Sequence, residues 1–176
     1  YAFLRSLPPV AQANRPHALR FPYNTQAALA VWRERYFQPA GFQRDATQSA
    51  AWNRGAYLVQ GLGHCAACHS QRNALGASGP VNDLSGGLMP VVNWYAPDLT
   101  RDPESGMAST PLPEIVRLLR TGASATAQTN GPMGEVVQHS LQHLKETDLQ
   151  AMAVYLQSRA QNTSQPAPAQ AKPARI

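Results

Sequence analysis

Residues 64–69 read His64-Cys65-Ala66-Ala67-Cys68-His69, and this short stretch decides how the rest of the sequence is interpreted. Its two cysteines are the only ones in the 176-residue chain. They stand three positions apart, so a helical turn would place both sulfurs on one face. A framework disulfide needs partners distant in sequence, and the chain offers none. The two cysteines must therefore be explained together with the histidine that follows them.

The pattern Cys-x-x-Cys-His is the attachment signature of c-type haem. Thiols at this spacing can reach the two vinyl-derived carbons at one edge of a porphyrin, and the next imidazole can then bind the iron as proximal ligand. We therefore predict one covalent haem c, held by Cys65 and Cys68 and ligated by His69.

Two other interpretations of these cysteines remain open. With His139 and His143 they form a Cys₂His₂ set of zinc ligands. However, 70 residues separate Cys68 from His139, which is far more than a zinc finger uses, and His69 would be left unexplained. A thioredoxin-type dithiol would need a βαβ context that the sequence does not show.

A haem with electron-transfer function needs a second axial ligand, and the chain has four methionines. Met152 falls in the apolar stripe of the last predicted helix, where packing explains it. Met133 lies in Asn130–Gly134, between small residues that allow the backbone to approach a flat ring closely. We favour Met133 as distal ligand, with Met107 and Met89 as alternatives.

Haem propionates carry negative charge and require hydrogen-bond donors. Arg72 follows the motif closely enough to reach back as a charge-assisted partner. Trp94 and Tyr95 can donate from an indole N–H and a phenolic hydroxyl. These three residues are the predicted propionate partners.

Charge and composition divide the chain into three parts. Residues 1–46 hold six Arg and two acidic residues, and four prolines interrupt the stretch 8–26, so we expect an extended arm. Residues 47–160 are nearly neutral and form the predicted domain. Residues 161–176 are rich in Pro, Ala and Gln, and we expect a disordered tail. The basic excess therefore lies on the flanks, unlike the clustered basic face of a nucleic-acid binder, and no apolar run is long enough to span a membrane.

Apolar periodicity predicts an all-α domain of about four helices around the haem. The expected helices cover 48–60, 111–121, 132–144 and 148–159, with a further short helix over 27–38 in the arm. Thr110 and Thr147 are the predicted N-caps of the second and fourth domain helices. The stretch 70–109 has no clear period, so a buried cofactor is expected to organise it.

The segment Tyr57–Ala77, YLVQGLGHCAACHSQRNALGA, resembles the haem-binding segments of multihaem cytochrome c subunits. Those subunits serve membrane-bound alcohol, aldehyde and gluconate-type dehydrogenases. Further similar stretches are Trp52–Gly55, Gly86-Gly87, Ala96–Thr100, Leu119–Gly122 and Gly131–Ser140.

This resemblance implies a class I cytochrome c fold over residues 47–160, with His69 as proximal and Met133 as distal ligand. It implies three haem domains in series, whereas this sequence holds one Cys-x-x-Cys-His. An excised middle domain would account for the difference, because the opening residues resemble the end of a preceding haem domain. A natural single-haem protein with retained flanks is the alternative. The resemblance also implies a periplasmic location, membrane association through a parent protein or complex, a dehydrogenase subunit as electron donor, and quinone or a terminal oxidase as acceptor.

We accordingly expect an electron-transfer domain rather than an enzyme in its own right. The alternative function is a haem enzyme or ligand-binding haem domain, in which the sixth position exchanges its ligand.

Overall fold

The computed structural model describes residues 2–161, and it divides the chain into two compact units, residues 1–40 and the part from Gly41 onward. The predicted division after residue 46 stays a prediction. Apart from Gln161, the expected tail at 161–176 lies outside the described residues.

The N-terminal unit contains two helices, α1 (Ala2–Ser6) and α2 (Gln26–Tyr36). Thr25 caps α2, because its side-chain oxygen accepts a hydrogen bond from the amide of Ala28 at 3.2 Å. Neither helix contains a buried residue. The expected helix over 27–38 is therefore present, one residue earlier at its start and two residues shorter at its end.

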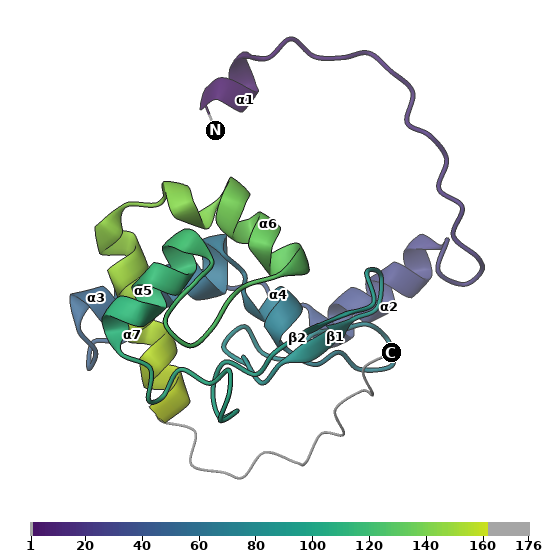
Figure 1. Ribbon diagram of the computed structural model, residues 1–176. Helices are drawn as coiled ribbons and strands as arrows, with labels where there is room; N and C mark the ends of the chain where they lie inside the picture. The colour runs from purple at the N-terminus through teal and green to yellow at the C-terminus, as the bar shows by residue number, and fades with distance from the viewer. Residues whose placement is uncertain (1, 162–176) are drawn as a thin grey trace. The chain divides into compact units, whose positions relative to one another are not determined.

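The second unit is built on the packing of α3 (Ala50–Tyr57) against α7 (Glu146–Gln161) (Figure 1). The two helices approach closely at Gly55, where an added Cβ would lie 2.0 Å from the carbonyl oxygen of Ala151. Beside this point the rings of Trp52 and Tyr155 meet edge to face with centroids 5.0 Å apart. Glycine is therefore required here by the space between two backbones.

Helix α3 begins at a Ser49 cap, whose hydroxyl accepts from the amide of Trp52 at 3.1 Å, and it continues as one wide turn of π-helix, Leu58–Leu62 (η1). The short helix α4 (Ala66–His69) follows directly. The predicted first helix is confirmed, and its continuation delivers the chain to the cysteine motif.

Three further helical elements complete this unit. They are α5 (Leu112–Thr121), α6 (Gly131–His139) and the single 3₁₀ turn Leu141–His143 (η2). The apolar stripe of α5 packs with α3, η1 and α7 around one core. The buried members of that core include Leu58, Val59, Leu84, Ile115, Leu119, Leu149, Met152, Tyr155 and Leu156.

A two-stranded antiparallel hairpin is an addition to the predicted helical fold. Strand β1 (Gly87–Met89) pairs with β2 (Trp94–Ala96), and Leu88 lies opposite Tyr95 in the register. The hairpin interrupts the stretch 70–109, which shows no apolar period. Two three-residue strands are too short to produce a recognisable alternation, so sequence patterning could not find them.

The helical fold class is confirmed, with corrections at three boundaries. Helix α5 begins at Leu112 with Pro111 as its N-cap, so Thr110 is not the cap. Helix α7 begins at Glu146, which places Thr147 inside the first turn rather than at the cap. The helix expected over 132–144 ends at His139, and a 3₁₀ turn follows it.

Within residues 2–161, the structure contains no helix that combines the length and the apolar character needed to cross a lipid bilayer.

We predict that Gly55→Ala destabilises the protein by about 1–3 kcal/mol or more, because the new methyl group collides with the α7 backbone. Chemical denaturation of the full chain measures the change. Gly61→Ala is the matched control, since no atom lies within 4 Å of its added Cβ. Equal stability of the two variants would contradict the close approach.

Candidate functional site

The cysteine motif forms one tight helical turn. Cys65 stands directly before α4, and the amide of His69 donates to the Cys65 carbonyl at 2.9 Å. Cys65 is partly buried, Cys68 is exposed, and both are free thiols. His64 enters this turn with φ +32°, a conformation that is uncommon outside glycine. The two cysteines therefore stand one helical turn apart, as their spacing predicts.

His69 is buried, with 7% of its surface exposed, and its ring is held by a single acceptor. Nδ1 lies 2.8 Å from the carbonyl oxygen of Pro97. Because a carbonyl can only accept, Nδ1 carries the proton, and Nε2 of the neutral ring keeps a free lone pair. This is the arrangement by which proteins orient an imidazole for metal binding.

Burial also sets the protonation of the motif. Removal from water lowers the pKa of His69, and this outweighs the opposite effect of its hydrogen bond to Pro97. The imidazole is therefore neutral at neutral pH. Burial raises the pKa of the Cys65 thiol to about 11, so this group is protonated under the same conditions.

The turn that carries Pro97 is fixed by its own hydrogen bonds. The Asp98 carboxylate accepts from the amide of Thr100 at 2.7 Å, and the Asp98 carbonyl accepts from the hydroxyl of Ser105 at 2.7 Å. The amide of Leu99 donates to the Leu84 carbonyl at 2.9 Å. The acceptor for His69 is thus part of an ordered loop.

The hairpin contacts the motif through its first strand. The amide of Gly86 donates to the His69 carbonyl at 2.8 Å. A Cβ added to Gly87 would lie 2.1 Å from the Ser70 carbonyl oxygen, so β1 runs against the chain that leaves the motif.

The second strand of the hairpin reaches the segment that carries Met133. A Cβ added to Gly131 would lie 2.6–2.8 Å from three indole atoms of Trp94, so the indole covers this residue. Gly131 has φ +52° and begins α6, and Met133 follows in its first turn, partly buried against the core. The hairpin therefore connects the His69 segment with the Met133 segment.

The other methionines occupy different surroundings. Met107 and Met152 are buried core members with 6% and 2% exposure, so packing explains both. Met89 ends β1 and is half-buried. These surroundings set Met107 and Met152 apart as core residues, and ligation by Met133 stays a prediction.

The predicted propionate partners make contacts of their own. The guanidinium of exposed Arg72 donates to the carbonyls of Ala67 and Gly76 at 2.6 and 3.1 Å. Partial burial, with Asp98 and Asp102 nearby, raises the pKa of Tyr95, so its hydroxyl stays protonated. Trp94 is 44% exposed and lies on Gly131.

The zinc alternative finds no support in the geometry. In residues 2–161, no three His, Cys, Asp or Glu side chains converge in a way that could hold a metal ion. His139 and His143 are both exposed.

Pro97 is the functional residue that reasoning from residue types missed. Its role depends on a main-chain carbonyl, which any residue possesses. The general rule that a metal-binding imidazole needs a second acceptor predicts that such a partner exists, and it does not say which residue supplies it.

The donor set fits covalent haem. Two free thiols stand one turn apart, and a neutral, oriented imidazole directly follows them. Consistent with this, residues 53–160 match the family model described as cytochrome c.

This chain belongs to the cytochrome c family. Membership implies covalently bound haem c and a role in electron transfer, and it confirms the resemblance noted from the motifs.

Similar curated proteins include several components of dehydrogenases. The chain is 44% identical to a subunit of nicotinate dehydrogenase from Pseudomonas putida, over 90% of its own length and 13% of that protein. It is 38% identical to the gluconate 2-dehydrogenase cytochrome c subunit of Pantoea cypripedii, over 89% of this chain and 37% of that one. It is 36% identical to the fructose dehydrogenase cytochrome subunit of Gluconobacter japonicus, over 90% of this chain and 32% of that protein.

The chain therefore spans between 13% and 37% of the length of these relatives. Membership of the cytochrome c family confirms the expected electron-transfer domain. Two of these relatives are named as the cytochrome subunits of dehydrogenases.

We predict that Gly131→Ala destabilises the cytochrome by about 1–3 kcal/mol, because a methyl group would meet the Trp94 indole and φ is left-handed. Thermal unfolding measures the change. Gly134→Ala, three residues later in the same helix, has its nearest neighbouring atom 4.0 Å away and should be neutral or slightly stabilising. Equal unfolding temperatures of the two variants would show that the Trp94 indole does not pack against Gly131.

Proposed function

We propose that this cytochrome transfers single electrons through one haem c attached to Cys65 and Cys68, with His69 and Met133 as axial ligands. The observation that carries the proposal is the hydrogen bond from His69 Nδ1 to Pro97, since it leaves Nε2 of a neutral ring as the available donor atom. One Cys-x-x-Cys-His in the chain supports a single haem.

Haem c, when bound, supplies an iron that accepts and releases single electrons. The residues of this chain hold and tune it. The two thiols fix the group covalently, so it cannot dissociate between turnovers. His69 is kept in one orientation by Pro97, and the neutral thioether of Met133 favours the ferrous state and raises the potential relative to a second histidine.

Arg72, Trp94 and Tyr95 are proposed to serve the propionates. Arg72 has five N–H donors and two of its nitrogens already bind main-chain carbonyls, which keeps the guanidinium beside the motif. The raised pKa of Tyr95 keeps its hydroxyl a donor. Trp94 has an indole N–H to donate.

The relatives support a proposal for the physiological context of the cytochrome. Those named as cytochrome subunits of gluconate and fructose dehydrogenases support a dehydrogenase subunit as electron donor. We propose a periplasmic location, membrane association through the parent complex, and delivery of electrons to quinone or a terminal oxidase.

Met133→Ala tests the distal ligand. The ferric variant should lose the weak far-red sulfur-to-iron absorption band, and its reduction potential should fall by a substantial part of the roughly 0.8 V over which axial ligands tune haem proteins. Spectroelectrochemical titration measures both quantities.

Met107→Leu is the control, because Met107 is a buried core residue and its replacement should leave band and potential nearly unchanged. If the absorption spectrum and the reduction potential of Met133→Ala are unchanged, Met133 is not the distal ligand. Rapid binding of carbon monoxide by the reduced wild-type protein would favour the alternative function, a haem site with an exchangeable sixth position.

A further inference from the structure

The segment that carries Met133 has little apolar anchoring. Val137 is the one buried residue among the nine of α6. An open surface depression of about 630 Å³ lies between the loop 122–130 and this helix, lined by Gly122, Gln128, Thr129, Gly134 and Val137 among others. Beyond Val137, the contact of Trp94 with Gly131 and the partial burial of Met133, the segment is positioned by polar contacts in the loop 122–130 that precedes it.

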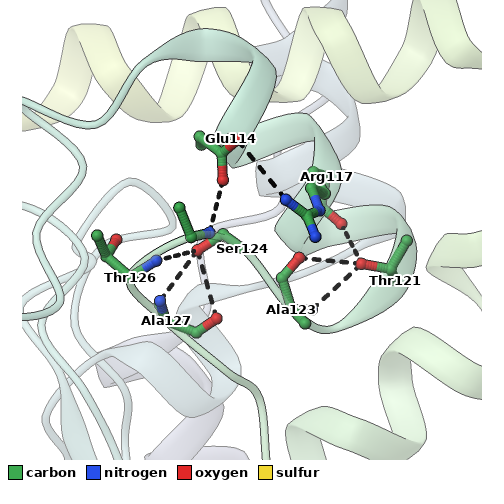
Figure 2. Close-up of polar contacts among 8 residues, drawn as sticks. Glu114, Arg117, Thr121, Ala123, Ser124, Thr126 and Ala127 are labelled. Atoms are coloured by element: carbon green, nitrogen blue, oxygen red, sulfur yellow. Dashed lines mark hydrogen bonds and ion pairs between the residues drawn. The ribbon is translucent and has the colours of Figure 1, made fainter.

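Glu114 supplies one such contact from the first turn of α5. Its Oε2 accepts a hydrogen bond from the amide of Ala125 at 2.7 Å, and Figure 2 shows the carboxylate between this loop and Arg117. The guanidinium of Arg117 lies 4.0 Å from Oε1. A charged acceptor makes this a stronger bond than a neutral pair would.

The loop is also closed on itself. The amide of Ser124 donates to the Ala127 carbonyl at 2.8 Å, and the Ser124 hydroxyl accepts from the amide of Ala127 at 3.0 Å (Figure 2). At its base, the amide of Thr129 donates to the Gly122 carbonyl at 2.7 Å. Because these bonds stiffen the loop, a restraint applied at Ala125 is passed on to the residues before Met133.

Glu114 belongs to a helix that is well packed against the core. Its neighbours Ile115 and Val116 are buried in the core, and Leu119 one turn later is buried as well. The Glu114 side chain is only 29% exposed, so its contact with the loop is partly shielded from water. The bond therefore joins the loop to the rigid part of the domain.

We propose that Glu114 is a positioning residue, which holds the loop 122–130 and thereby determines how readily Met133 leaves the haem iron. This inference rests on the proposed ligation by Met133. It assigns to a side chain on α5 the control of ligand exchange at the sixth position.

The test is the affinity of imidazole for the ferric protein with its haem attached. Imidazole binds when Met133 has left, so its apparent affinity scales with the population of that open state. Glu114→Ala should raise the affinity roughly three- to tenfold, as expected for loss of one hydrogen bond that is partly exposed to water. Glu114→Gln should lie between the wild type and Glu114→Ala, because its amide oxygen can still accept from Ala125 but carries no charge.

Amide hydrogen exchange gives a second readout that does not depend on the haem. The Ala125 amide should exchange faster in Glu114→Ala than in the wild type, by a similar factor. If Glu114→Ala lowers overall stability, Glu114→Asp replaces it, since the shorter side chain withdraws the carboxylate while keeping its charge.

Glu146→Ala is the matched control. It removes the same charge from an exposed glutamate that pairs with Arg120, so it reports any effect of charge alone. Equal imidazole affinity in Glu114→Ala and Glu146→Ala would overturn the role of Glu114. If Met133→Ala loses the far-red band while Glu114→Ala leaves affinity unchanged, this inference fails and the proposed function stands; if Met133→Ala keeps the band, both fail.

Discussion

The imidazole of His69 donates its Nδ1 proton to the carbonyl of Pro97, and much of the site follows from this one bond. It fixes the tautomer, so the remaining ring nitrogen is a donor atom with a defined direction. It also joins the short helix of the cysteine motif to the loop that leaves the hairpin. The hairpin in turn contacts Ser70 through Gly87 and covers Gly131 with Trp94. Pro97, which lies in a loop outside any helix or strand, therefore has a central structural role.

The helical core and the ligand-bearing segments are held by different forces. Where α3 meets α7, the backbones approach so closely that Gly55 has no space for a side chain, and Trp52 and Tyr155 pack beside it. The start of α6 has little such packing and depends on hydrogen bonds in the preceding loop. A rigid frame with a less tightly packed segment suits the proposed role of Met133, which would have to be positioned accurately to bind the iron.

Strong local signals made much of this predictable from the sequence. The spacing of Cys65, Cys68 and His69 indicated haem attachment because that pattern serves few other purposes. The apolar stripes of α5 and α7 located these helices to within one or two residues at each end. The hairpin could not be predicted, since three-residue strands carry no usable pattern, and Pro97 could not be identified because its contribution is a main-chain oxygen. The contact between Trp94 and Gly131 joins residues 37 positions apart, and no local rule reports it.

Covalent attachment of haem to this chain, and its binding by nitrogen and thioether sulfur, can be measured together. The most direct measurement is the visible absorption spectrum of the oxidised and dithionite-reduced protein, recorded after denaturing extraction has removed any loosely bound haem and the protein has been refolded. The account predicts sharp ferrous c-type bands that stay with the polypeptide, and a weak far-red band in the oxidised state. Absence of haem absorbance from protein matured with the haem-attachment machinery would contradict it.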